Sequence, residues 1–396
     1  MVCGYSLSYL RFAKPRGFKG DFYAAMYDPN WWDGQGIIYG PIFVFERWFV
    51  NSSPDFASIE FFALTGLVLI ILGLLITIRT VQARGSLLVF CGVVWSLNTF
   101  FYYSFSVASN PEILELFFLL TMWWSLTNKH YNLAYFLFTC AVLTKLAPAI
   151  LAPVLLLFFS WSGLAISLFM TVFVYTIVSI GQNQSLLQSL KQTLAVNPVD
   201  PAPTSEQFLG INSALSRLFG LTSSSNFQVV ETISLLILFT FYSCAIVVLV
   251  RFLRLQSDFE HKNIVTYFFA LFMTLLPMMH LGQAHRHTFL FLAPVFVAMK
   301  YLVKQDSNLN QRRKYNNAMS IIFIGYSFLP IYALDYFNFD DLNGRTFLGE
   351  LHSSFVMVTE PIWINIILFL VILNYGNRML NLRKKHRKIL EFKAQN

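Results

Sequence analysis

The chain has 396 residues, of which 56% are hydrophobic and only 12% are charged, and its formal net charge is +8. A soluble domain carries about 25% charged residues, whereas the apolar residues here form blocks long enough to cross a bilayer as helices of about 20 residues. The composition therefore excludes an ordinary soluble domain. The blocks are too long and continuous for barrel strands, so the spans are predicted to be helices.

The basic residues do not indicate a nucleic-acid partner. They fall in short loops between the apolar blocks and in the C-terminal tail, which is where membrane topology places them. The four cysteines, Cys3, Cys91, Cys140 and Cys244, include no CxxC pair, and three of them lie within apolar segments. This pattern predicts neither a disulfide framework nor a cysteine metal site.

A polar stretch at residues 20–48 precedes the first complete apolar block. It carries Asp21, Asp28 and Asp33 among aromatic residues, although Asp and Glu together number only 20 in the whole chain. A carboxylate held near a membrane surface can act as a general base on a sugar hydroxyl, so we interpret this stretch as a catalytic outer loop. The alternative is a solvated connector, because Pro29 and several glycines are typical turn residues.

The apolar blocks predict an all-α polytopic membrane protein with about 11 transmembrane helices and extracytoplasmic loops, in a single domain over residues 1–396. The block at 133–159 is expected to form two short membrane helices that break near Lys145 and Pro148, because proline removes a backbone donor. A large outer loop is expected at 181–230 and a basic cytoplasmic tail at 377–396. The predicted spans are 57–78, 86–107, a shorter one ending near 126, the pair within 133–159, then 163–180, 231–250, 264–280, 288–303, 316–334 and 361–376.

The positive-inside rule assigns two sides to these loops. With the basic tail in the cytoplasm, the basic residues at 79–84, 129, 251–262 and 300–314 also fall inside. The outer side then receives 20–48, 110–112, the Lys145 turn, 181–230, 283–287 and 335–360. Most of the unusual polar residues thus share one face, which we expect to be the working face.

This topology leaves the first outer loop without a preceding span. Residues 1–10 are mildly apolar and far too short to cross a membrane, and basic residues follow them instead of preceding them as in a signal peptide. We expect that a first span is missing from this sequence, which would raise the number of transmembrane helices to about 12.

Lys145 is an ionisable residue deep in an apolar segment. Such residues are costly in a membrane and rarely face lipid, so they are functional candidates by default. Beside a helix break, Lys145 could bind the phosphate of a lipid-linked donor as a point charge. The alternative is a lysine whose side chain reaches the membrane interface along an apolar stem.

Two further segments carry candidate phosphate ligands. His285, Arg286 and His287 lie between two spans, and arginine contacts phosphate in a bidentate manner; the alternative is a short polar turn. No acidic residue accompanies the two histidines, so no metal site is expected. In the outer loop, Arg217 is a candidate phosphate ligand, whereas the alternative is an amphipathic surface helix capped by Asn212.

Four motifs follow one another in an order that resembles glycosyltransferase family 87, the polyprenyl-phosphate-mannose-dependent mannosyltransferases of the GT-C superfamily. The resemblance covers about residues 20–300. The motifs are Asp21-Phe22 followed by Tyr39-Gly40-Pro41, a Lys-x-x-Pro at 145–148, an Asn-Ser-x-Leu-x-Arg-Leu run at 212–218, and His287 seven residues before Pro294. The chain departs from the family at 110–112, where Asn-Pro-Glu stands in place of Gly-Gln-x-Asn.

The resemblance implies a GT-C-like helical bundle that needs neither a cofactor nor a metal. It implies transfer of a hexose, mannose in this family, from a polyprenyl-phosphate donor to a lipid or glycan acceptor on the extracytoplasmic face, with inversion. By this resemblance Asp21 would be the base, His287 its partner and Lys145 a residue on the donor side. The residues themselves add further candidates: Arg286, Arg217 and His285 for the donor or its phosphate, and Asp28, Tyr39, Glu112 and Asn212 for the acceptor or for support of the site.

The resemblance also implies a multi-pass protein of the bacterial inner (plasma) membrane. Three other classes stay open, one of which is a purely structural membrane subunit. An O-antigen ligase or polymerase also works on lipid carriers with arginine and histidine but needs no carboxylate base. A transporter would show inverted repeats and charged residues near the membrane midplane, and no repeat is visible in this sequence.

Overall fold

The fold was analysed in a computed structural model of the chain. It describes residues 41–42, 59–98, 112–158, 161–181, 183–194, 211–218, 227–254, 260–279, 286–328 and 361–395. Regular structure within these ranges is entirely helical. The predicted catalytic loop at 20–48 lies outside the described residues, apart from 41–42.

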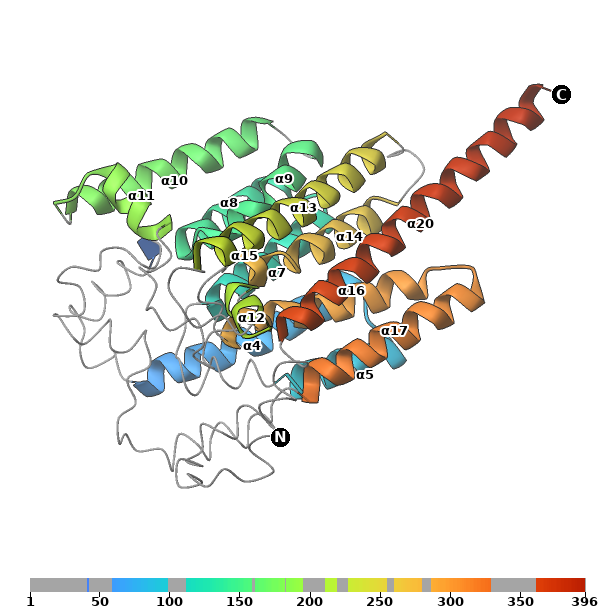
Figure 1. The fold of residues 1–396 in the computed structure, drawn as a ribbon, viewed down its shortest axis with the longest axis horizontal. Coiled ribbons are helices and arrows are strands. Elements are labelled where there is room, and N and C mark those ends of the chain that lie inside the picture. Colours follow the sequence, from blue (N-terminus) through green and yellow to red (C-terminus); the bar gives the residue numbers. More distant parts are fainter. Residues whose placement is uncertain are drawn as a thin grey trace.

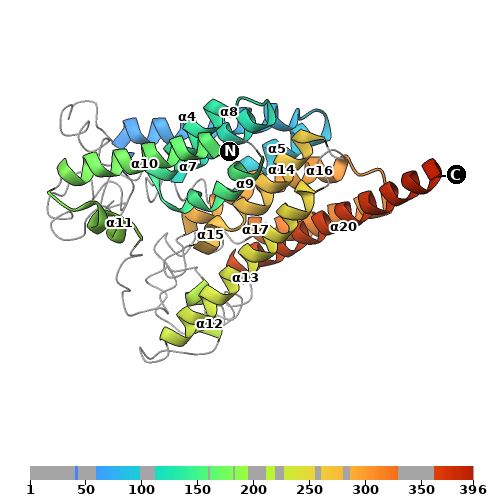
Figure 2. The ribbon, with the colours of Figure 1, turned by 90° about the horizontal axis from the view of Figure 1, so that it is seen from above.

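The helices form a bundle in which most long axes run side by side (Figures 1 and 2). In chain order they are α4 (Ile59–Val81), α5 (Ser86–Ser96), α7 (Glu112–Thr127), α8 (Tyr131–Thr144), η3 (Ala147–Leu151), α9 (Ala152–Phe158), α10 (Trp161–Gly181), α11 (Leu186–Leu194), α12 (Ile211–Leu218), α13 (Phe227–Leu253), α14 (His261–Met273), α15 (Leu276–Met279), η6 (Arg286–Phe291), α16 (Leu292–Lys304), α17 (Leu309–Phe328) and α20 (Pro361–Gln395).

Five segments of the described part are long and apolar enough to cross a membrane, judged by length and composition. They are Leu64–Val81, Trp161–Gly181, Val229–Leu253, His261–Met279 and Ile362–Arg383. The chain is therefore a helical membrane protein, as its sequence predicts. The predicted number of about 11 spans stays a prediction.

Burial divides these helices into a centre and a periphery. Nearly every side chain of α14 and α16 is buried, and the two helices pack against each other. Around α14 lie α7, α13 and α20. On α10, by contrast, large apolar side chains such as Phe169 and Ile180 are exposed. A helix of this composition exposes such a surface where lipid replaces water as its solvent, so α10 belongs to the outer surface of the bundle.

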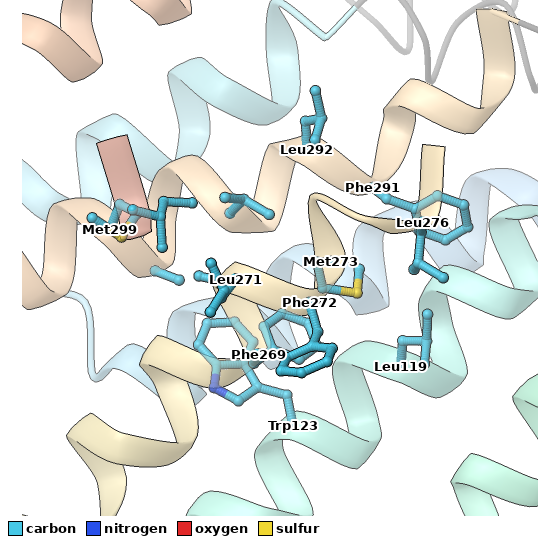
Figure 3. Packing of buried hydrophobic residues seen from close by; sticks show 14 of the residues in the cluster. Leu119, Trp123, Phe269, Leu271, Phe272, Met273, Leu276, Phe291, Leu292 and Met299 are labelled. Atoms are coloured by element: carbon cyan, nitrogen blue, oxygen red, sulfur yellow. The ribbon is translucent and has the colours of Figure 1, made fainter. Parts of the chain in front are cut away.

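The centre holds aromatic residues at its helix contacts (Figure 3). Trp123 of α7 stacks on Phe269 of α14 with ring centroids 4.5 Å apart, and its indole nitrogen donates to the Thr266 hydroxyl at 3.3 Å. Buried indole groups usually find such a partner. These contacts hold α7 and α14 together, and α7 is the helix that begins at the candidate site.

Basic residues gather at one end of the bundle, where several loops that the sequence assigns to the same side meet. Arg378 pairs with Asp306 at 2.6 Å, and Arg251 donates to the side-chain oxygen of Asn377 at 3.1 Å. Lys262 lies over the ring of Tyr301. The helices α13, α16 and α20 thus carry their basic residues to a common end, which agrees with the predicted grouping of these loops.

The C-terminal tail continues the last membrane helix. The predicted span ended near residue 376, whereas α20 runs from Pro361 to Gln395 and extends beyond the other helices (Figures 1 and 2). A 35-residue helix is about 52 Å long, well beyond the roughly 30 Å of a hydrocarbon core. The basic part of α20 therefore projects from the membrane.

Candidate functional site

The first feature of the site is the break in the apolar block 133–159, which the sequence predicts. Helix α8 ends at Thr144, and Lys145 follows in an extended conformation. Pro148 lies four residues after Thr144 and has no N–H to donate to the Thr144 carbonyl, which explains the end of the helix. The Tyr135 hydroxyl donates to the Leu155 carbonyl at 3.4 Å, which joins α9 to α8 across the break.

Lys145 pairs with Glu112, the first residue of α7. The two charged atoms, Lys145 Nζ and Glu112 Oε1, lie 2.6 Å apart, and the side chains are 19% and 0% exposed. The lysine therefore binds a buried carboxylate at the break. The alternative interpretation, in which Lys145 extends to the membrane interface, does not account for its ion pair with Glu112. Glu112, predicted as a supporting residue, fixes the position of the Lys145 ammonium.

A second carboxyl group, Glu115, lies on the next turn of α7 and was missed in the sequence. It is 1% exposed, and neither of its carboxyl oxygens has a hydrogen-bond partner among the described residues. Lys145 and Glu112 are the charged groups that act on it electrostatically. The sequence did contain a signal for Glu115, because an acidic residue inside an apolar segment is a functional candidate. However, a glutamate near the start of a helix also has an ordinary explanation, because a negative charge there is favourable.

A second interruption lies within the predicted span 264–280, which the structure contains in the membrane-crossing segment His261–Met279. Helix α14 ends at Met273, four residues before Pro277, so the same missing N–H accounts for this break. The freed carbonyl of Thr274 accepts a hydrogen bond of 2.8 Å from the side-chain amide of Asn365 in α20. Non-helical backbone inside a membrane protein requires such partners.

A third irregular element, the 3-10 helix η6, precedes α16. The Phe289 carbonyl and the Asn98 side-chain oxygen each lie 3.0 Å from the Tyr326 hydroxyl, and its single proton can be donated to one of them at a time. Pro294 falls in the first turn of α16, where proline is tolerated. Tyr326 thereby anchors η6 against α17.

The three interruptions meet at the same end of the bundle. The short helix α15 packs against both η3 and η6, and η6 also packs against α7. Figure 3 shows Leu119 of α7 close to Leu276 of α15 and Phe291 of η6. The Lys145–Glu112 pair and Glu115 therefore lie at the joint of three broken segments, where backbone is not confined to regular helix.

The remaining predicted site residues are described less completely. Asp21, Asp28, Tyr39 and His285 lie outside the described residues. Arg286 and His287 are the first two residues of η6, so their backbone lies in the element that packs against α7, while their side chains are outside the described part. The same holds for the side chain of Arg217 in α12.

Asn212 does not occupy the predicted capping position. Helix α12 begins at Ile211, so Asn212 falls inside the first turn, and its buried side-chain oxygen has no hydrogen-bond partner within the described part of the chain. The apolar residues Ile211, Ala214 and Leu215 are buried, and the helix packs against α13. The helix is amphipathic as predicted, but its cap was wrongly assigned because a cap at Asn212 places the helix start two residues late.

Comparisons with known proteins give no family. Family models, curated proteins and solved structures contain no match to this chain. Among the described residues, no group of three or more His, Cys, Asp and Glu side chains is placed to hold a metal ion. The fold defines the class as a helical membrane protein with a buried charged cluster at the joint of interrupted helices.

Proposed function

We propose that this chain is a multi-pass membrane glycosyltransferase that moves a hexose, mannose in our assignment, from a polyprenyl-phosphate donor to a lipid or glycan acceptor. The observation that carries the proposal is the Lys145–Glu112 pair at the break after α8. Buried charges beside irregular backbone are costly within a membrane, and a lipid-linked phosphate is a ligand that reaches such a site from the bilayer. A GT-C-like architecture in the bacterial inner membrane belongs to the same proposal.

The geometry of the pair suits a phosphate ligand. An ammonium group has three N–H donors, and Lys145 directs one to Glu112 at 2.6 Å. Two donors remain for phosphate oxygens, and Glu112 prevents the side chain from turning away. Arg286, Arg217 and His285 would supply further contacts to the donor.

The proposed reaction is a single displacement. The Asp21 carboxylate takes the proton of an acceptor hydroxyl, and the resulting oxygen attacks the anomeric carbon as the bond from that carbon to the phosphate oxygen breaks. Polyprenyl phosphate leaves with the bonding electrons, and Lys145 stabilises its charge. His287 would orient the base, with Asp28, Tyr39, Glu112 and Asn212 in supporting positions.

The test is transfer of labelled mannose from synthetic polyprenyl-phosphate-mannose by the purified chain, with a membrane extract as the source of acceptor. The matched variant is Asp21→Asn, which keeps size and polarity and removes the base. Transfer by the wild type and a loss of about 100-fold or more in the variant is expected from general-base catalysis. Absence of transfer by folded wild-type protein would contradict the proposed donor.

A transporter is the second candidate, and the interrupted helices favour it. Discontinuous membrane helices that meet near charged residues form the binding sites of many transporters, and α8 and α14 are both interrupted. Reconstituted vesicles discriminate the two functions: a transporter would move its substrate without cleaving it, whereas the transferase would release polyprenyl phosphate.

A further inference from the structure

The carboxyl group of Glu115 is buried without a hydrogen bond from the residues that the structure describes. It is 1% exposed, and neither of its oxygens accepts a hydrogen bond from this part of the chain. Burying a polar group without a hydrogen bond is unfavourable, and burying an unpaired charge more so. Helix α7 therefore retains a group that weakens its own packing, which is the kind of local conflict that functional sites show.

The position of Glu115 on α7 gives the direction in which it faces. Residues four apart lie on one face of a helix, so Glu115, Leu119 and Trp123 share a face. Trp123 stacks on Phe269 of α14, and Leu119 lies beside Leu276 and Phe291 (Figure 3). Glu115 thus lies one turn further along the same face, toward the joint and away from lipid.

The charge balance of the cluster narrows the class of ligand. Lys145 is paired with Glu112 and donates no hydrogen bond to Glu115, so while that pair is intact a ligand would have to supply donors to Glu115. A metal ion is disfavoured, because the described residues offer no group of three or more ligands and the Lys145 ammonium acts on the same carboxyl. Neutral hydroxyl groups satisfy two carboxylate oxygens without adding charge.

We infer that Glu115 binds the hydroxyl groups of the hexose that the lipid phosphate carries, and so determines recognition of the sugar. This inference rests on the proposed function and adds a residue to it. Lys145 holds the phosphate, and Glu115, on the adjacent turn of α7 from Glu112, accepts hydrogen bonds from two neighbouring hydroxyls. Glu115 is a binding residue, and the base remains Asp21.

The experiment compares two ligands on purified full-length protein. Dissociation constants are measured for polyprenyl-phosphate-mannose and for bare polyprenyl phosphate of the same chain length. Wild-type protein is expected to prefer the sugar-bearing lipid by about tenfold or more, as two additional hydrogen bonds allow. Glu115→Leu is expected to bind both lipids equally, with its affinity for the bare lipid within about twofold of wild type, since it loses only the sugar contact.

Two further variants control the result. Glu115→Gln keeps an acceptor oxygen and is expected to retain part of the preference, which separates lost hydrogen bonds from a repacked helix. Thr121→Ala changes a hydroxyl on the same helix that is bonded to the Phe117 carbonyl, and it is expected to keep the full preference. An unfolded Glu115→Leu would be recognised by its thermal transition, and Glu115→Gln would then carry the test.

Three other results would contradict the inference, and they differ in whether the proposed function survives. Wild-type preference for the sugar lipid that persists in Glu115→Leu would overturn the role of Glu115 and leave the proposed function intact. Equal binding of both lipids by the wild type would also overturn it, while lipid-phosphate binding stands. Binding of neither lipid by folded wild-type protein would remove the proposed function and this inference together.

Discussion

At the scale of single residues, the Lys145–Glu112 pair contributes to stability because losing either partner would leave the other charge buried and unpaired. Removing one partner of a buried pair leaves an uncompensated charge, which typically costs about 3–5 kcal/mol of stability, whereas replacing both partners by apolar residues is often neutral. The second carboxyl, Glu115, makes the two partners unequal, because Lys145 acts on it as well.

The cluster therefore predicts an asymmetry between two variants. Lys145→Met leaves two buried carboxyl groups without a cation and is expected to lower stability by about 3–5 kcal/mol. Glu112→Leu is expected to cost less, because Lys145 can turn toward Glu115. The double variant should lie closer to the wild type than Lys145→Met does. Thermal unfolding in detergent measures all three.

An exposed lysine provides the control for this series. Lys304 lies at the other end of the bundle and is exposed, so Lys304→Met should change stability by less than about 0.5 kcal/mol. A Lys145→Met variant as stable as Lys304→Met would show that the buried pair does not stabilise the fold, and it would weaken the case for a site at this joint.

At the scale of elements, close helix packing at Gly376 fixes the position of α20. A methyl group added there would lie 1.9 Å from the hydroxyl oxygen of Tyr267, and that hydroxyl donates to the Ile372 carbonyl at 3.3 Å. Gly376→Ala is expected to lower stability by about 1–3 kcal/mol, the range for overpacked sites. Gly92→Ala is the matched control, since nothing lies within 4 Å of its added methyl group.

Thermal unfolding in detergent again provides the measurement. Because alanine favours helix over glycine, Gly92→Ala should be neutral or slightly stabilising. Equal stability of the two variants would mean that α20 and α14 can separate at this contact without loss.

The break in α14 depends on a side chain from another helix. Asn365 is fully buried and donates to the freed Thr274 carbonyl, so Asn365→Leu should cost about 1–3 kcal/mol for the unsatisfied carbonyl. Asn374→Leu on the same helix is the control, because Asn374 is exposed and bonds to a Tyr315 hydroxyl at 3.2 Å. Chemical denaturation of both variants would show whether the two losses differ; similar losses would contradict a special role for Asn365.

Proline explains which interruptions the sequence could predict. Pro148 beside an intramembrane lysine drew attention to the break after Thr144, and the structure confirms it. Pro277 carries the same information for α14, but no charged residue accompanies it, so the span was predicted without its break. The partner of the freed carbonyl, Asn365, lies 91 residues away along the chain, and contacts at such a distance are invisible to a local pattern.

At the scale of the whole molecule, the sequence predicted the class of fold better than the site. Helical spans follow from the composition and from the need to satisfy backbone groups in lipid. Glu112 and Lys145 were each singled out, but their pairing depends on how α7 and α8 pack, which neither segment encodes alone. Glu115 was missed because a glutamate in a first helical turn has an ordinary explanation.

Sidedness is the whole-molecule property on which the proposed function depends. The joint with Lys145 and the basic end with Arg378 lie at opposite ends of the bundle. Helix α16 follows η6, which is part of the joint, and ends in Lys304, two residues before Asp306 of the Arg378–Asp306 pair. The positive-inside rule predicts that the basic end lies in the cytoplasm. The joint would then face the other side, where the proposed function requires the lipid-linked sugar to be used.

Two conservative cysteine variants test this assignment. Ser185→Cys lies at the turn between α10 and α11, and Ser307→Cys lies between α16 and α17; both serines are exposed. A membrane-impermeant thiol reagent is expected to label Ser185→Cys in intact cells and Ser307→Cys only after permeabilisation. Labelling of the wild type measures the contribution of the native cysteines. The reverse pattern would place the charged joint in the cytoplasm, and a transferase that acts on the outer face would then be excluded whatever the affinity of the site for lipid phosphates.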